Sequence, residues 1–213
     1  MASSYLIGCD EAGKGPVLSS LIVCVAICDR LHEKSLKKFC KKDSKQLSAR
    51  QREEILAELD KFCTFKTVEL TAADLNSMMK TMSLNDIEAK AMASILKNLT
   101  GDIMIDLLDR YEWTFRERMQ RFGVKRFEAQ HKADENFPIV AAASIKAKVL
   151  RDLRVKEAIE ATGVDFGSGY PSDPKTIAAL KDAEMRKKLK PYIRERWQTL
   201  ENIKQKKLFE DEV

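Results

Sequence analysis

Short apolar runs alternate along the chain with longer segments in which apolar residues recur every three or four positions. The runs that predict buried strands cover residues 5–9, 21–27, 62–70, 102–108 and 124–130. Helical spacing predicts helices over residues 48–61, 83–99 and 138–161, and the region from Thr176 to the end is expected to be mostly charged helix. This order predicts an α/β domain with a mixed sheet flanked by helices.

Polar and turn-forming residues mark the ends of several predicted helices. Ser48 precedes one of them and is expected to cap it. Thr71, followed by Asp74, has the spacing of a capping box. Pro138 suits the first position of the long Ala-rich helix, and Gly163 suits its end. The boundaries of that helix are therefore expected near residues 138 and 161.

Length and composition indicate an ordinary folded domain with an appendage. The chain has 213 residues, of which 44% are apolar and 33% charged. The longest apolar stretch, residues 17–28, contains Ser19 and Ser20 and is too short to cross a bilayer, and no secretory signal is visible. The five cysteines include no C-x-x-C pair, so they are expected to be reduced thiols of a cytoplasmic protein that does not engage a membrane.

The distribution of charge is more informative than the net charge of +5. Residues 34–52 contain eight basic residues and one acidic residue, and residues 181–207 contain ten basic and four acidic residues. Each block alone is most simply a solvated face. Two basic blocks on either side of an acidic centre also suit a nuclease, whose partner is a polyanion.

Four carboxylates stand where predicted strands end or a helix begins. Asp10 and Glu11 end the first strand, Asp106 lies in a later one, and Asp134 precedes the long helix. An Asp within an apolar strand is costly to bury unless it is paired or binds a metal ion. Mg²⁺ or Mn²⁺ accepts such oxygen ligands, and two ions can activate water and stabilise a leaving 3′-oxygen. Each acid alone could instead be a turn or cap residue.

The sequence around Asp10 and Glu11 also matches the start of a phosphate-binding loop, but the match does not continue. Residues 8–14 fit G-x-x-x-x-G-K, but Gly15 follows where Ser or Thr is needed to bind Mg²⁺. Pro16 and a strand-like run come next, where a helix should begin. The sequence therefore argues against binding of a nucleoside triphosphate.

Five motifs, in order along the chain, resemble those of ribonuclease HII in its archaeal form. They are G-C-D-E-A-G-K-G-P at residues 8–16, D-S-K-Q-L-S at 43–48, the acid Asp106, H-K-A-D at 131–134 with the helix that follows to residue 152, and G-S-G-Y-P-S-D at 167–173. Lys14 departs from the arginine that is commoner in the family. Lysine offers a point charge and not a bidentate fork, so its grip on phosphate is expected to be looser.

The resemblance implies a ribonuclease H-like fold and a metal-dependent endonuclease. Its substrates would be the RNA strand of RNA/DNA hybrids and single ribonucleotides in duplex DNA, nicked on the 5′ side to leave 3′-hydroxyl and 5′-phosphate ends. Asp10, Glu11, Asp106 and Asp134 would hold Mg²⁺ or Mn²⁺. Gly13, Lys14, Gly15 and Tyr170 would bind around the ribonucleotide and its 2′-hydroxyl, the group that distinguishes RNA from DNA.

Other residues are weaker candidates for phosphate contact or support of the metal site: Ser44, Lys45, Lys132, Ser144 and Lys148. Ser144 on the Ala-rich helix is better interpreted as a small packing residue. His131 is expected to be a structural or surface residue, because Mg²⁺ prefers oxygen ligands. Trp113 and Trp197 are expected to pack against the core and not to stack on a ligand.

The remaining expectations concern domain organisation and partners. Residues 1–165 are expected to form the catalytic domain and residues 166–213 a C-terminal helical extension. The segment Gln205–Phe209 faintly resembles a sliding-clamp-binding motif, with altered spacing, and the protein is expected to be a monomer. Two other interpretations stay open: another metal nuclease of the same fold, such as a Holliday-junction resolvase, and a non-catalytic nucleic-acid-binding protein that uses only its basic blocks.

Overall fold

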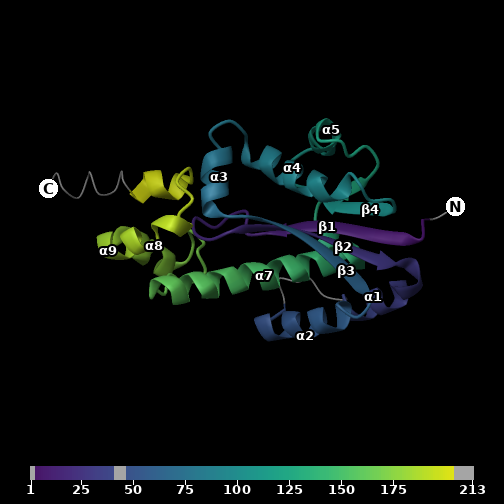
Figure 1. Cartoon of the computed structure of the whole chain (residues 1–213), viewed down its shortest axis with the longest axis horizontal. Helices are drawn as coiled ribbons and strands as arrows, with labels where there is room; N and C mark the ends of the chain where they lie inside the picture. Colours follow the sequence, from purple (N-terminus) through teal and green to yellow (C-terminus); the bar gives the residue numbers. More distant parts are fainter. Residues whose placement is uncertain (1–2, 41–46, 204–213) are drawn as a thin grey trace. The chain divides into compact units, whose positions relative to one another are not determined.

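The computed structural model, which describes residues 3–40 and 47–203, contains a five-stranded sheet with the order β3-β2-β1-β4-β5 (Figure 1). The strands are β1 (Tyr5–Ala12), β2 (Leu21–Asp29), β3 (Cys63–Leu70), β4 (Asp102–Asp106) and β5 (Glu128–Gln130). β1 pairs antiparallel with β2 and parallel with β4, which in turn pairs parallel with β5. The predicted mixed sheet is therefore confirmed.

The chain divides into two compact units, which are described separately. The first comprises Met1–Ala12, Ile22–Glu69 and Ser83–Leu150, and the second comprises Gly13–Leu21, Leu70–Met82 and Arg151–Val213. Both units are discontinuous in sequence. The expected division at residue 165 stays a prediction.

Helices cover both faces of the sheet in the first unit. α4 (Leu84–Leu96) and α5 (Glu112–Arg121) lie on one side, and α1 (Glu33–Phe39), α2 (Ala49–Leu59) and the first half of α7 lie on the other (Figure 1). A short 3-10 helix, Arg30–His32, precedes α1, and α6 (Ala133–Asn136) precedes α7 (Pro138–Thr162). Side chains of β2, α1, α2 and α7 share one buried apolar cluster.

The start of α7 packs directly against β1 at Gly8. A Cβ atom on Gly8 would collide with the backbone of Ile139 and Val140, so only glycine permits this approach. The small residues Ala141, Ala142 and Ala143 on the same helix are all buried. Close approach of α7 brings the side chains of its first turns to the strand that carries Asp10.

Several predicted helix ends are confirmed. Ser48 caps α2 and Thr71 caps α3 (Ala72–Met78), each in a complete capping box, and Ser83 caps α4. The long helix begins at Pro138 and ends at Thr162, and Gly163 follows it in a left-handed conformation with φ +65°.

Three strand predictions need correction. β1 extends beyond the apolar run of residues 5–9 to Ala12, because Asp10, Glu11 and Ala12 keep their pairing with β2, and the first two acids lie near the end of the strand, as predicted. β4 ends at Asp106, earlier than residue 108. The strand expected over residues 124–130 is reduced to 128–130, because Val124 donates its N–H to Met119 and so belongs to the end of α5.

The second unit contains α3, α8 (Pro174–Lys181), α9 (Ala183–Lys188) and the 3-10 helix Lys190–Tyr192. A second buried cluster joins residues of the 13–21 segment, the end of α7 and the C-terminal region, among them Val17, Leu18, Phe166, Leu180 and Ile193.

The described part of the C-terminal region, up to residue 203, is mostly helical as expected, but the helix is broken in several places. Asp182 ends α8 and caps α9, and Pro191 follows soon after. Ile193 then leaves helical geometry to form an isolated β-bridge with Leu18, and helix resumes only over residues 198–203. Because Pro191 has no N–H and Ile193 is buried by that bridge, one continuous helix cannot form here.

Two general expectations can be compared with the described residues. All five cysteines are free and buried. Within residues 3–40 and 47–203, no helix has the length and apolar character needed to cross a bilayer.

Candidate active site

Three aspartates from distant parts of the sequence come together in the first unit. Asp10 is buried in β1, with 4% of its surface exposed, and Asp134 is buried to the same extent in α6. The charges of Asp106 and Asp134 both act on Asp10 and raise its pKa. The structure thus unites residues that lie up to 124 positions apart in sequence, as the predicted acidic site requires.

The register of the sheet explains why Asp106 meets Asp10. Cys9 of β1 pairs with Ile105 of the parallel strand β4, so the next residue of each strand lies at the same end of the sheet. Asp106 then accepts a hydrogen bond of 2.7 Å from the N–H of Ala133. This bond ties the end of β4 to the helical turn that carries Asp134.

Lys132 makes the turn that brings Asp134 into position. Its backbone is left-handed, with φ +57°, which is uncommon for a residue other than glycine. Its side chain is exposed and pairs with Glu135 at 3.2 Å. The structure therefore shows a backbone role for Lys132, and phosphate contact stays a prediction.

Asp10 has a raised pKa because of its surroundings. Burial is the largest cause, the charges of Asp106 and Asp134 add to it, and together they raise the pKa of Asp10 to about 7. Two hydrogen bonds oppose this rise: one from the Ser144 hydroxyl and one of 2.7 Å from the Glu11 N–H. Ser144 is therefore more than a small packing residue, because it supports the ionised form of Asp10.

Glu11 follows Asp10 in β1, so its side chain leaves the strand on the opposite face. Its charge acts on the buried thiol of Cys9, as do those of Asp10 and Asp106. Burial and these charges raise the pKa of Cys9 well above its usual value, so this thiol stays protonated. Glu11 thus lies beside the group of aspartates, although it enters from the other side of β1.

The donor set suits a hard divalent cation. The converging groups are carboxylates, which Mg²⁺ and Mn²⁺ prefer, whereas the adjacent thiol is protonated and unsuited to them. Within the described part of the chain, no three His, Cys, Asp or Glu side chains already stand at metal-ligand distances from a common point. The residues fit the ion by chemistry and proximity, and their role as ligands stays a prediction.

The second unit contains the glycine-rich loop. Gly13 has φ +95°, and a Cβ atom on it would lie 2.7 Å from the Ser20 carbonyl oxygen, so glycine is required there. Gly15 is exposed, and a Cβ atom on it would lie 3.3 Å from the Tyr170 ring. Lys14 lies between them, half-buried. The predicted grouping of Gly15 with Tyr170 is therefore present in the structure.

Tyr170 is held on a rigid support while 38% of its surface stays exposed. The guanidinium of Arg151 lies 5.0 Å from the ring centroid and also donates to the Ser168 carbonyl. Ser168 in turn donates to Asp173 from both its N–H and its hydroxyl, each at 2.7 Å. The exposed ring is thus held by contacts with its own unit, and its role as a platform for a sugar or base stays a prediction.

Three functional candidates in the second unit were not identified from the sequence as parts of the site. Arg151 supports Tyr170, while Arg194 and Trp197 donate hydrogen bonds to carbonyls of the Gly13–Gly15 loop. Arg151 occurs within the motif that extends to residue 152, which was the only available signal. Trp113, which was expected to pack against the core, is 62% exposed and stacks on the exposed ring of Tyr111, because it lies on the outer face of α5.

The structure says less about the roles of the four remaining candidate residues. Ser44 and Lys45 lie outside the described residues. Lys148 is half-buried on α7. His131 lies near the Arg110 carbonyl at 3.3 Å, as expected for a structural residue.

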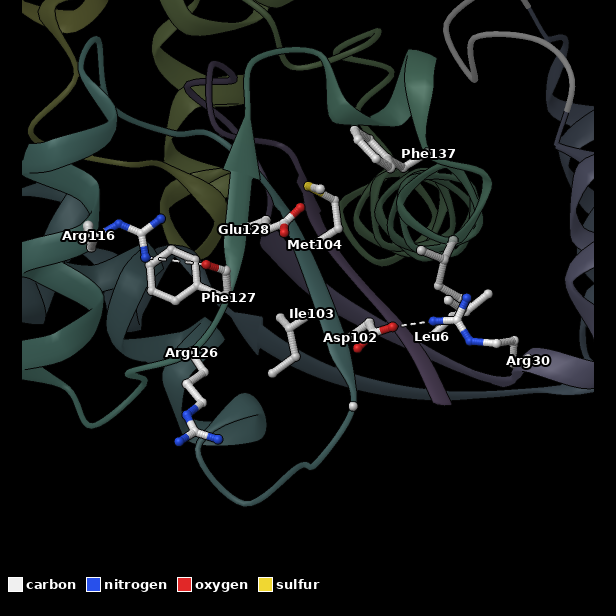
Figure 2. Close-up of a pocket in the computed structure, with 12 residues that line it drawn as sticks. Leu6, Arg30, Asp102, Ile103, Met104, Arg116, Arg126, Phe127, Glu128 and Phe137 are labelled. Atoms are coloured by element: carbon white, nitrogen blue, oxygen red, sulfur yellow. Dashed lines mark hydrogen bonds and ion pairs between the residues drawn. The ribbon is translucent and has the colours of Figure 1, made fainter. Parts of the chain in front are cut away.

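A separate hollow of about 660 Å³ lies at the other end of β4 from Asp106 (Figure 2). Its floor is apolar and includes Ile103 and Phe127. Arg30 pairs there with Asp102, and Arg116 lies 4.8 Å from the Phe127 ring centroid and donates to that residue's carbonyl. These contacts hold residues at the ends of β2 and β4 and beside β5, and the residues that line the hollow do not include Asp10, Glu11, Asp106 or Asp134.

Known proteins share both the motifs and the fold. The family model for ribonuclease HII matches residues 7–200. A ribonuclease HII from Archaeoglobus fulgidus is 38% identical over 202 residues, which cover 94% of this chain and 97% of that protein.

Solved structures of similar proteins have the same fold as this chain. The ribonuclease H2 from Pyrococcus horikoshii has a TM-score of 0.82 and 33% identity, covering 95% of this chain and 98% of that one. The ribonuclease HII in a PCNA:RNase HII complex from Archaeoglobus fulgidus has a TM-score of 0.81 and 36% identity, covering 90% and 94%. With its acids and its glycine-rich loop in family order along the sequence, this chain belongs to the ribonuclease HII family.

Proposed function

We propose that this protein cuts the RNA strand of RNA/DNA hybrids and nicks duplex DNA on the 5′ side of single ribonucleotides. The products would carry 3′-hydroxyl and 5′-phosphate ends, and the reaction would use two Mg²⁺ or Mn²⁺ ions. Membership of the family supports an endonuclease of the ribonuclease H type. The chemistry of the product ends and the number of metal ions go beyond what membership of the family supports.

One observation carries the proposal: Asp10 is buried beside Asp106 and Asp134, and burial, together with the charges of these two acids, raises its pKa to about 7. Carboxylates this close repel one another, so their shared location is costly unless a cation compensates it. A purely structural role would be served better by neutral residues at these positions. The same buried charges have a clear use as ligands of divalent ions.

The side chains of the first unit would bind the ions. Asp10, Glu11, Asp106 and Asp134 would provide the oxygen ligands, and Ser144 would keep Asp10 ionised through its hydrogen bond. When bound, divalent ions supply an activated water and stabilise the charge that develops on the leaving 3′-oxygen. The chain's own contribution is to place the negative charges and hold them before the substrate arrives.

The side chains of the second unit would bind the ribonucleotide. Gly13 and Gly15 allow close approach of a sugar-phosphate backbone, and Lys14 supplies a positive charge beside it. Tyr170 offers an exposed ring next to Gly15, supported from behind by Arg151. Together these groups would recognise the one nucleotide that carries a 2′-hydroxyl.

A single gel tests the proposed activity. The substrate is an end-labelled DNA duplex with one internal ribonucleotide, incubated with Mg²⁺, with Mn²⁺ or with EDTA. We expect one nick, mapped to the 5′ side of the ribonucleotide, in either metal and none in EDTA. An all-DNA duplex of the same sequence is the control, and cleavage of that control would refute the proposal.

Two other functions give different results in the same assay. A junction resolvase of the same fold would cut branched DNA without any ribonucleotide. A non-catalytic binding protein would shift both duplexes and cut neither, with or without metal. The aspartates whose charges act on Asp10 favour a metal-dependent nuclease over a non-catalytic binding protein.

Interaction with a sliding clamp is also proposed. The ribonuclease HII from Archaeoglobus fulgidus has been solved in a complex with PCNA, and it is 36% identical to this chain. The candidate segment Gln205–Phe209 lies outside the described residues. The test is binding of the clamp by the full chain and by a chain that ends at residue 203. Monomeric state and cytoplasmic location stay predictions.

A further inference from the structure

The glycine-rich loop of the second unit is held from two sides by hydrogen bonds. On one side, the Val17 N–H donates to the Gly169 carbonyl at 2.9 Å, next to Tyr170. On the other side, the Arg194 N–H donates to the Val17 carbonyl, also at 2.9 Å, and Ser19 donates to the Tyr192 carbonyl at 3.0 Å. The C-terminal segment of residues 192–197 therefore forms one wall of the loop.

Arg194 is the largest of the fully buried side chains. Burial of a guanidinium is costly unless acceptors replace its water. Arg194 obtains them from the loop: its Nε donates to the Ser19 carbonyl at 2.8 Å and its NH1 group to the Lys14 carbonyl at 3.3 Å. The position of the Lys14 backbone is thus coupled to a buried charge from the other end of the chain.

Ser19 shows that this wall imposes a strained shape on the loop. Its φ is +78°, a conformation that costs a non-glycine residue energy and needs surrounding contacts to persist. Those contacts are the two bonds that Ser19 makes with the segment, one through its N–H and one through its carbonyl. Strain of this kind indicates that the backbone conformation of the loop is important for function.

Trp197 adds a third bond, directly at the motif. Its indole N–H donates to the Gly15 carbonyl at 3.2 Å, and its ring lies 4.9 Å from the Arg194 guanidinium. Gly15 is also the residue that lies against Tyr170. The carbonyls of both Lys14 and Gly15 are therefore oriented by the C-terminal segment.

The segment is itself anchored by α3. The Asn76 side chain donates to the Ile193 carbonyl at 2.8 Å and accepts from the Glu195 N–H at 2.7 Å. These two bonds hold the backbone on each side of Arg194, so that the arginine meets the loop in a single geometry.

From this arrangement we infer that Arg194 and Trp197 are positioning residues that set the enzyme's preference for a ribonucleotide. The inference rests on the proposed function, in which the Gly13–Gly15 loop recognises the 2′-hydroxyl. A 2′-hydroxyl differs from hydrogen by one donor and one acceptor, so its recognition depends on fixed backbone groups. Phosphate contact tolerates a looser loop, because it depends on charge more than on geometry.

The test compares the affinities of the full chain for two duplexes that differ only in one 2′-hydroxyl. Binding is measured with Ca²⁺ in place of Mg²⁺, and a gel verifies that the duplexes stay intact. Trp197→Phe keeps an aromatic ring and removes the N–H that binds Gly15. We expect it to reduce the preference for the ribonucleotide duplex roughly threefold to tenfold, the range for loss of one hydrogen bond. Affinity for the all-DNA duplex should not change.

Arg194→Lys should reduce the preference further, since it removes two bonds to the loop, and thermal melting shows whether this buried variant folds. Trp113→Phe is the matched control, because it alters the other of the two tryptophans, which lies exposed on α5. It should leave both affinities unchanged.

Two results would overturn the inference: an unchanged preference in Trp197→Phe, or an equal loss of both affinities, which indicates a merely structural residue. Absence of any preference in the unaltered chain would instead reject the proposed function.

Discussion

Asp106 accepts a hydrogen bond from the backbone N–H of Ala133, and this bond of 2.7 Å joins the end of β4 to the turn that carries Asp134. The two acids that act on Asp10 are therefore held relative to each other by the backbone. A change that weakens this hydrogen bond should therefore shift the positions of both acids.

Ser144→Ala should weaken metal binding without removing it. The Ser144 hydroxyl stabilises ionised Asp10, and its loss makes ionisation, and hence metal binding, less favourable. One hydrogen bond to a charged group contributes about 1.5 kcal/mol or more. We expect the Mg²⁺ concentration for half-maximal cleavage at pH 7 to rise about tenfold, with little change in kcat at saturating Mg²⁺.

Ser94→Ala is the matched control for this variant. The Ser94 hydroxyl donates to the Ala91 carbonyl of its own helix, at 2.7 Å. It should not alter the Mg²⁺ requirement. If Ser144→Ala behaves in the same way, Ser144 is only a packing residue.

The raised pKa of Asp10 predicts a specific dependence of stability on pH. The pKa is about 7 in the folded protein and near 3.8 when the chain is unfolded, so the folded state holds this proton more tightly. The resulting stabilisation is complete below the unfolded pKa and is lost as the pH rises through 7. In EDTA, Asp10→Asn should therefore raise the Tm above that of the unaltered chain by several degrees at pH 8 and by much less at pH 4.5. A difference in Tm that does not vary with pH would contradict the assignment.

Tyr170→Ala should impair cleavage more than binding. The exposed ring beside Gly15 would position the ribonucleotide for cleavage, so its loss should misplace the reacting groups more than it weakens contacts along the rest of the duplex. We expect cleavage at a single ribonucleotide to fall at least tenfold and overall duplex affinity to fall by no more than about threefold. Tyr111→Ala, which removes another exposed tyrosine, is the control. Equal losses of rate and affinity would make Tyr170 a structural residue.

The sequence predicted the parts of the fold that depend on local pattern. Ser48, Thr71 and Pro138 begin helices where their side chains or ring geometry favour it. The approach of Asp106 to Asp10 was also predictable, since acids at the ends of neighbouring strands meet at one edge of a sheet.

Long-range contacts were not predictable in the same way. The bond from Arg194 to the Lys14 carbonyl joins residues 180 positions apart, and no local pattern marks it. The same contact explains a break in the mostly helical C-terminal region that no local pattern predicted: burial of Ile193 and Arg194 against residues 17–19 stabilises an extended segment more than their helix propensity favours a helix.

Binding of Mn²⁺, measured by calorimetry, tests the central claim most directly. The unaltered chain is compared with Asp10→Asn and with Asp102→Asn, which removes an exposed carboxylate at the other end of β4 that pairs with Arg30. We predict that Asp10→Asn weakens Mn²⁺ binding at least tenfold and abolishes cleavage while hybrid binding stays measurable, and that Asp102→Asn binds and cuts normally. Unchanged Mn²⁺ affinity or retained cleavage in Asp10→Asn would contradict the account.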